Sequence, residues 1–166
     1  MSAHPYTLFD AQSVSAKLIF TPCPGTQDTP LDDALMTLKS AGVDALITVM
    51  PDSELAENNV SNIAELCEQH GLAWFHLPVA DDCAPQADFE SKWENQKPEI
   101  LHRLKDGERI AIHCKGGSGR TGLIAAVLLT SLGLPLAEAT TQIQALRPKA
   151  LKHPVHVSWI SEFIGR

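Results

Sequence analysis

The sequence lacks the features that would place it in a membrane, in the secretory route or on nucleic acid. No run among its 166 residues is long and apolar enough to span a bilayer. Residues 1–10 lack a basic stretch followed by an apolar core, so we expect no secretory signal. Acidic residues outnumber basic ones by 20 to 13, and the net charge of −7 argues against nucleic acid and anionic membranes as bulk partners.

Cysteine is scarce, and the spacing of the cysteines does not indicate a metal site. The four cysteines are widely separated, and they do not form the paired spacing of a zinc site or a disulfide framework: Cys23, Cys67, Cys83 and Cys114. A chain of this length buries a sufficient core without covalent cross-links. We therefore expect reduced thiols, a cytoplasmic location and no metal centre.

Repeats, low-complexity tracts and linkers are also missing from the sequence. We therefore expect one domain over residues 1–166, of which residues 1–16 are an N-terminal segment of uncertain structure. The oligomeric state is left open by the sequence.

What the chain does contain is an alternation of short apolar strands with segments of helical period. Strands are predicted over residues 17–20, 43–50, 73–77 and 108–112. Helices are predicted from a Thr29 cap and Pro30 to Gly42, over 53–70, across Phe89–Leu104 with a kink or break near Pro98, and over 123–129, 137–146 and 155–164. The alternation predicts right-handed βαβ units, and hence an α/β fold with a mostly parallel central sheet flanked by helices.

The most informative segment is His113–Gly122, which lies between a predicted strand and a predicted buried helix. A helix N-terminus presents unpaired N–H groups and partial positive charge, and glycines let successive N–H groups converge on one anion. Cys114 opens the loop, and the same environment favours its nucleophilic thiolate. Arg120 closes the loop with a planar fork that matches two oxygens of a phosphoryl group. This combination predicts phosphoryl transfer through a cysteinyl-phosphate.

Other interpretations of the loop fit less well. Gly117-x-Gly119-x-x-Gly122 formally matches the dinucleotide-binding fingerprint, but it lies late in the chain and no strand-ending acidic residue follows about 20 positions on. The Gly-Lys-Ser/Thr of a nucleotide-binding P-loop is missing. A zinc site at His113 and Cys114 lacks a second pair of ligands. A purely structural glycine turn leaves Arg120 unexplained.

The stretch HCKGGSGRTG resembles the signature loop of the cysteine-dependent protein tyrosine and dual-specificity phosphatases. The resemblance implies a phosphatase-like fold and hydrolysis of phosphomonoesters without metal or cofactor. It implies Cys114 as the nucleophile, Thr121 as a hydroxyl that eases release of the cysteine sulfur, and His113 as a residue that orders the loop. It also implies phosphate binding by the rest of the loop: Lys115, Gly116, Gly117, Ser118, Gly119 and Arg120. Lys115 either adds positive potential at the pocket mouth or points to solvent.

A leaving group on phosphorus needs a proton donor, and two aspartates follow a predicted strand end at the same edge of the sheet as Cys114. Pro78-Val79-Ala80-Asp81 resembles the acid segment of the kinase-associated phosphatase branch. The resemblance to that branch extends from about Pro24 to Phe163 and is loose outside the motifs. The resemblance assigns the acid to Asp81, with Asp82 as the alternative. The alternative interpretation is that neither aspartate is the acid and that both are solvated loop or capping residues.

Arg147-Pro148-Lys149-Ala150-Leu151 resembles the Arg-Pro-Gly segment of dual-specificity phosphatases, in which a later glutamine positions the attacking water. Here Lys149 replaces the glycine, and His156 stands in place of the glutamine. We interpret His156 as a surface histidine.

The predicted function is removal of phosphate from phosphoproteins or phosphopeptides, with phosphotyrosine, phosphoserine and phosphothreonine all candidates. Two alternatives remain: a phosphoinositide or other small-molecule phosphatase, which Lys115 favours and Ser118 disfavours, and a phosphate-binding module without turnover.

Overall fold

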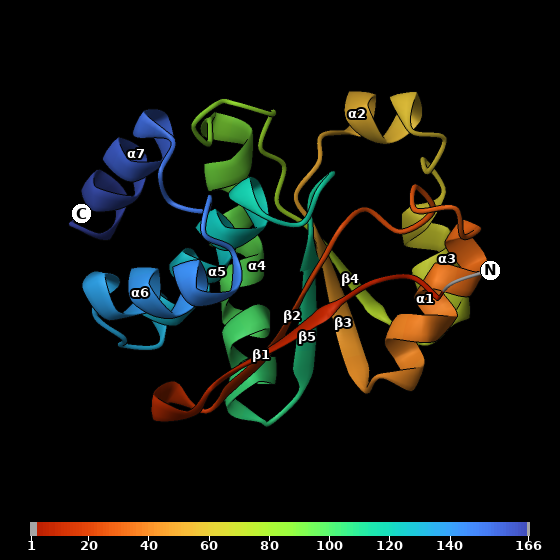
Figure 1. The fold of residues 1–166 in the computed structure, drawn as a ribbon, viewed down its shortest axis with the longest axis horizontal. Helices are drawn as coiled ribbons and strands as arrows, with labels where there is room; N and C mark the ends of the chain where they lie inside the picture. The colour runs from red at the N-terminus through yellow and green to blue at the C-terminus, as the bar shows by residue number, and fades with distance from the viewer. Residues whose placement is uncertain (1–2, 166) are drawn as a thin grey trace.

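The computed structural model describes residues 3–165, in which one five-stranded sheet forms the centre of the molecule (Figure 1). The strand order is β1-β2-β5-β3-β4. Strand β1 runs antiparallel to β2, and the β2–β5, β5–β3 and β3–β4 pairs are parallel. The strands are β1 Thr7–Ala11, β2 Ala16–Thr21, β3 Val43–Thr48, β4 Ala73–His76 and β5 Arg109–His113. The predicted α/β fold with a mostly parallel sheet is therefore confirmed.

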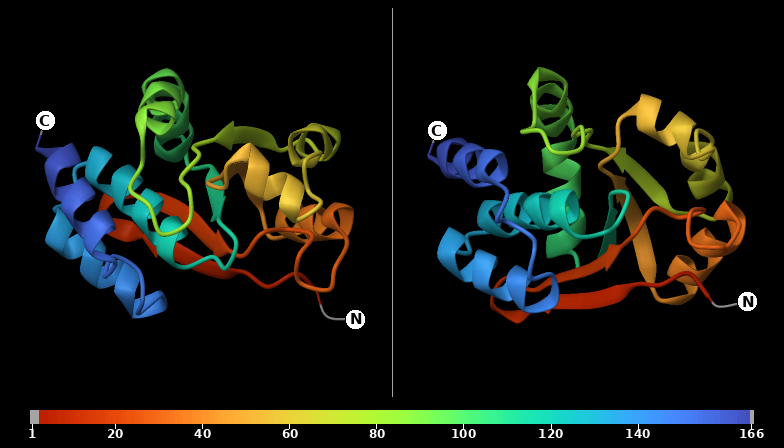
Figure 2. Two further views of the ribbon diagram at one scale, coloured as in Figure 1. Left: turned by 90° about the horizontal axis from the view of Figure 1, so that it is seen from above. Right: turned by 45° about the horizontal axis from the view of Figure 1, so that its top comes forward.

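Helices cover both faces of the sheet, as the two views in Figure 2 also show. Helices α1, α2 and α3 lie on one face: Leu31–Ser40, Asp52–Glu57 and Ile63–Gln69. Helices α4, α5, α6 and α7 lie on the other: Ala87–Lys105, Gly119–Ser131, Leu136–Leu146 and Pro154–Ile164. No helix in the described part of the chain has both the length and the apolar character needed to cross a membrane.

Each face of the sheet has its own apolar core, because successive strand residues point to opposite sides. On β5, Ile110 and Ile112 join the core under α4–α7, and Ala111 joins the core under α1–α3. The central strands are buried on both faces, which explains why they appear in the sequence as continuous apolar runs. Helix α5 is almost wholly buried in the larger core.

Several predicted boundaries need correction. Helix α1 begins at Leu31 with Pro30 as the flanking residue, and the Thr29 hydroxyl, predicted as the cap, donates to the carbonyl of Gln27 at 3.3 Å. Helix α4 continues through Pro98, because Pro98 lies on its exposed face, where water can bind the carbonyl that the proline leaves unpaired. The predicted helix over residues 53–70 is two helices, separated by a turn in which Asn59 has the positive φ of 60°.

The topology brings three neighbouring strand ends together at one edge. Thr21 at the end of β2 and Thr48 at the end of β3 both stand opposite His113 at the end of β5. The main chain that follows β3 is held to the same place, since the Val49 N–H donates to the His113 carbonyl at 3.0 Å. The segment that links β5 to α5 is therefore supported on both sides.

Candidate active site

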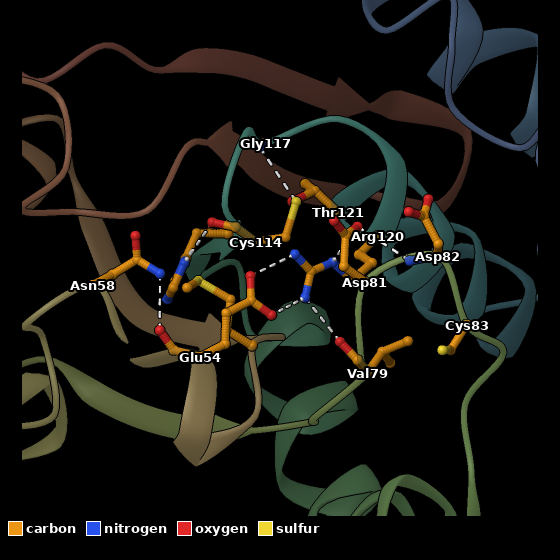
Figure 3. A network of polar contacts seen from close by, with 12 residues as sticks. Glu54, Asn58, Val79, Asp81, Asp82, Cys83, Cys114, Gly117, Arg120 and Thr121 are labelled. Carbon is orange, nitrogen blue, oxygen red and sulfur yellow. Dashed lines mark hydrogen bonds and ion pairs between the residues drawn. The ribbon is translucent and has the colours of Figure 1, made fainter. Parts of the chain in front are cut away.

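The loop between β5 and α5 surrounds the sulfur of Cys114 with hydrogen-bond donors (Figure 3). The Gly117 N–H donates to Cys114 Sγ at 3.3 Å, and the Thr121 hydroxyl donates to it at 3.2 Å. Cys114 itself is 4% exposed, and α5 begins only five residues later, at Gly119. Two hydrogen-bond donors and the N-terminus of a helix are thus directed at one sulfur.

Glycine is required at two positions of this segment. Gly117 has a φ of +79°, and a Cβ there would lie 2.7 Å from backbone atoms of Thr21 and Pro22, so a larger residue would displace the loop. A Cβ on Gly122 would lie 2.5 Å from the Cβ of Ala150. Gly122 therefore lets the turn that follows α6 pack directly on the first turn of α5.

His113 is fully buried beneath the loop and connects it to β3 and β4. Its Nδ1 lies 3.1 Å from the Cys114 carbonyl, which only accepts, so Nδ1 carries the proton. Its Nε2, 2.8 Å from Thr48 Oγ1, then accepts from that hydroxyl, which in turn accepts from Trp74 Nε1 at 2.8 Å. Burial lowers the pKa of His113 to about 4, so the imidazole is neutral near pH 7.

Arg120 is oriented by a residue that the sequence analysis missed. Its Nη1 donates to Glu54 Oε1 at 2.7 Å and to the Val79 carbonyl at 2.9 Å, and its Nη2 donates to Glu54 Oε2 at 2.8 Å. Burial alone would lower the pKa of Arg120, but the hydrogen bond to Glu54 and the charges of Cys114, Glu54 and Asp81 raise it above its usual value. Glu54 lies on α2, 66 residues before Arg120, and no local motif distinguishes it from other helical glutamates.

The bonds to Arg120 leave one edge of its guanidinium open. Arg120 has five N–H donors. One on Nη1 and one on Nη2 donate to Glu54, and the second on Nη1 donates to the Val79 carbonyl. The remaining donors are on Nε and Nη2, which share one edge of the plane. Such an edge matches two oxygens of a phosphoryl group.

The two candidate acids after β4 point to different partners. Asp81 Oδ1 lies 3.6 Å from Arg120 Nε, beside the open edge of the guanidinium. Asp82 Oδ1 lies 3.7 Å from Nε2 of His153, on the turn that precedes α7. The positive φ of Asp82, 59°, separates the two side chains, and its N–H donates back to Asp81 Oδ1 at 3.1 Å (Figure 3).

A cavity of about 350 Å³ opens above the loop. Five of the predicted phosphate-binding residues line it together with Cys114 and both aspartates: Lys115, Gly116, Ser118, Gly119 and Arg120. Gly117 instead packs against the Thr21–Pro22 backbone. The cavity wall also includes residues from the end of the chain: Lys149, His153 and His156.

The interpretation of His156 as a surface residue is wrong. His156 is 4% exposed, and its Nε2 lies 3.0 Å from the carbonyl of Cys83, so Nε2 carries the proton and donates. Burial lowers the pKa of His156, which is consistent with a neutral ring. The sequence could not show this burial, because the histidine is covered by the distant acid loop rather than by its own helix.

The other cysteines differ from Cys114. Cys23 and Cys67 are buried, and burial raises the pKa of each to about 12, so both stay as thiols. Cys83 is exposed on the acid loop.

The sheet order, the buried helix after β5 and the cysteine–arginine loop define a phosphatase-like α/β protein, and comparison with known proteins specifies its family. Residues 28–145 match the family model described as Cyclin-dependent kinase inhibitor 3 (CDKN3), and the chain belongs to this family. The rat protein named Cyclin-dependent kinase inhibitor 3 is 37% identical over 95 residues, which cover 57% of this chain and 43% of the relative. The chain thus spans less than half the length of that relative.

A putative tyrosine phosphatase, 197R of Invertebrate iridescent virus 6, is 29% identical over 126 residues, 75% of this chain and 43% of the viral protein. Among solved structures, kinase associated phosphatase with its catalytic cysteine replaced by serine has a TM-score of 0.86 at 24% identity, with 98% of this chain and 95% of that chain covered. The active form of Tk-PTP has a TM-score of 0.67 at 26% identity, with 92% and 95% covered. These likenesses support the fold derived above.

Proposed function

We propose that this protein is a cysteine-dependent phosphatase that removes phosphate from phosphoproteins through a cysteinyl-phosphate. The observation that carries the proposal is the pairing of Cys114 Sγ, which accepts from Gly117 and Thr121, with the open edge of Arg120 held by Glu54. A nucleophile and a bidentate oxyanion receptor at the floor of one cavity fit a phosphoryl group and its transfer. The similarity to a viral putative tyrosine phosphatase supports the same reaction.

We assign a residue of the cavity to each step of the proposed reaction. Cys114 Sγ bonds to phosphorus while the bond to the leaving oxygen breaks, and Asp81 gives that oxygen its proton. The loop amides and Arg120 hold the other phosphoryl oxygens. Water then attacks phosphorus and gives a proton to Asp81, while the sulfur leaves as a thiolate that Thr121 stabilises. His113 keeps the loop in shape through the Cys114 carbonyl.

The substrates that we propose are phosphotyrosine and also phosphoserine and phosphothreonine in proteins or peptides. We further propose that residues 1–166 act as one phosphatase domain, since both apolar cores share one sheet. We also propose that the protein works in the reducing cytoplasm, which suits its unpaired thiols.

A phosphoinositide substrate is less favoured, because Ser118 lines the cavity where a second lysine would suit a polyanion. A module without turnover would have no use for the Asp81 carboxyl beside Arg120.

Replacement of the nucleophile tests the proposal. The wild-type protein, Cys114→Ser and the control Cys83→Ser are assayed against an aryl phosphate and phosphopeptides, and binding of vanadate is measured in parallel. We expect Cys114→Ser to lose turnover, because a neutral hydroxyl is a far poorer nucleophile, and to retain binding of a phosphate analogue. Cys83→Ser retains turnover. Substantial turnover by Cys114→Ser would refute the covalent mechanism, and an inactive wild-type protein would refute the assignment as an enzyme.

A further inference from the structure

The turn after α6 is fixed against the signature loop by several contacts. Arg147 Nε donates to the Gly117 carbonyl at 2.9 Å, and its Nη2 donates to Thr7 Oγ1 at 3.1 Å. Ala150 packs against Gly122, and its carbonyl accepts from Gln144 Nε2 at 2.9 Å. Residues on both sides of Lys149 are therefore anchored, and Lys149 is presented at the rim of the cavity.

Two lysines at this rim carry positive charge that the described residues do not neutralise. Lys149 and Lys115 are both exposed and line the cavity with Cys114. Within residues 3–165, neither ammonium group has a hydrogen-bond or ion-pair partner. The two carboxylates of the cavity, by contrast, each face a nitrogen of another side chain: Asp81 faces Arg120 and Asp82 faces His153. In a chain with a net charge of −7, such a concentration of free cations attracts anionic substrates locally.

The cavity also has more room than one phosphoryl group needs. Its volume of about 350 Å³ is in the range of sites that hold whole small ligands. The phosphoryl position is defined by Cys114 and Arg120, so the space toward Lys149 is left for a neighbouring part of the substrate. His153, at the start of α7, completes this side of the wall, and the N-terminus of the helix adds partial positive charge there.

We propose that Lys149, supported by Lys115 and His153, forms a second anion-binding subsite that selects phosphopeptides with an acidic or phosphorylated residue next to the phosphorylated one. This inference rests on the proposed phosphatase function and specifies its substrates. A peptide fits better than an inositol polyphosphate, because the exposed carboxylate of Glu57 borders the adjoining cavity, which Lys115 also lines. A substrate with negative charge on the Lys149 flank alone avoids this carboxylate, whereas a headgroup charged all round meets it.

Matched peptides and a matched lysine test the subsite. Two phosphotyrosine peptides differ only in Glu or Gln at the neighbouring positions, and a third carries a second phosphate there. The ratio of kcat/KM between the acidic and the neutral peptide is measured for wild type, Lys149→Gln and Lys152→Gln. Lys152 has the same charge and lies on the same segment, but it does not line the cavity.

We expect wild type to prefer the Glu peptide by about fivefold, and the doubly phosphorylated peptide by more, as is typical of exposed ion pairs. Lys149→Gln brings the ratio close to one, and Lys152→Gln leaves it near the wild-type value. A ratio of one in wild type, or an equal fall in both variants, would overturn the subsite. The ratio is internal to each variant, so a general loss of activity does not imitate the effect.

Two further results separate this inference from the proposed function. If wild type hydrolyses none of the peptides, the proposed function fails, and the relative affinity of Cys114→Ser for the Glu and Gln peptides, measured by calorimetry, still decides the subsite. A soluble phosphoinositide that is preferred over every peptide, with the preference lost in Lys149→Gln, would overturn the assignment to peptides.

Discussion

Glu54 holds Arg120 through both of its carboxylate oxygens, at 2.7 and 2.8 Å from the two terminal nitrogens of the guanidinium. The pair joins α2 on one side of the sheet to α5 on the other. Because Arg120 is buried and has a third bond to the Val79 carbonyl, the plane of the guanidinium is set before any substrate arrives. Such preorganisation removes an ordering cost from phosphate binding.

Glu54→Gln keeps the shape of the side chain but removes the charge and one acceptor. We expect kcat/KM for a phosphopeptide to fall by about 100-fold, because a small misplacement of Arg120 weakens its contacts with the transition state. Affinity for vanadate falls with it, while the near-ultraviolet circular dichroism of the fold is retained. The control is Glu57→Gln, an exposed glutamate on the same helix. Equal losses in the two variants would show that Glu54 acts only through local charge.

Thr121 donates its hydroxyl to Cys114 Sγ, so its main effect is expected when the sulfur leaves phosphorus. Thr121→Val removes the donor. We expect breakdown of the cysteinyl-phosphate to slow by about 10- to 100-fold, because a hydrogen bond to a charged group usually contributes a free energy of that size. Rapid-quench kinetics with an aryl phosphate would show a burst followed by slow turnover. Thr121→Ser restores single-phase turnover, and a Thr121→Val variant without a burst would contradict this role.

The buried histidine beneath the loop links pH to stability. His113 has a pKa of about 4 in the folded protein and an ordinary value near 6.5 when unfolded, so at pH 5 the unfolded chain binds a proton that the folded chain does not. Folding is therefore favoured at higher pH. The contribution of His113 to the free energy of unfolding is lost as pH falls from the unfolded pKa near 6.5 toward the folded pKa of about 4. Between pH 7 and pH 5 this loss amounts to about 2 kcal/mol.

Urea unfolding at pH 7 and pH 5 measures this linkage. We expect His113→Gln to lose stability at both values, but to show a smaller difference between them than wild type. His102→Gln, on the exposed face of α4, keeps the wild-type difference. An unchanged difference in His113→Gln would mean that other groups, such as His4 or His156, whose pKa values burial also lowers, account for the pH dependence.

What the sequence could predict depended on how local each feature is. The loop from His113 to Arg120 is contiguous, and its strand and helix are apolar runs, so its place at a strand end follows from the pattern alone. Glu54 meets Arg120 only because β3 and β5 are neighbours in the sheet, and His156 is buried only because the acid loop covers it. Long-range contacts of this kind produce no characteristic spacing of residues from which the sequence could predict them.

Asp81 and Asp82 are adjacent candidates for the general acid, and the sequence alone favours Asp81 only by resemblance. Asp81 Oδ1 lies 3.6 Å from Arg120 Nε, beside the edge that matches a phosphoryl group, whereas Asp82 Oδ1 lies 3.7 Å from His153 Nε2. Asp81 is therefore the proposed acid. General acid catalysis typically contributes about 10²- to 10⁴-fold, and its loss matters most when the leaving group is poor.

We expect Asp81→Asn to slow hydrolysis of a phosphotyrosine peptide by about 100-fold or more, and to slow that of an activated aryl phosphate far less. The alkaline limb of its pH–rate profile is flattened, because the group whose deprotonation produces that limb is missing. Asp82→Asn is the adjacent control and changes either rate little. If the two variants exchange these behaviours, Asp82 is the acid; if neither slows the peptide selectively, the proton comes from a residue elsewhere in the cavity, and His156 is the next to be replaced.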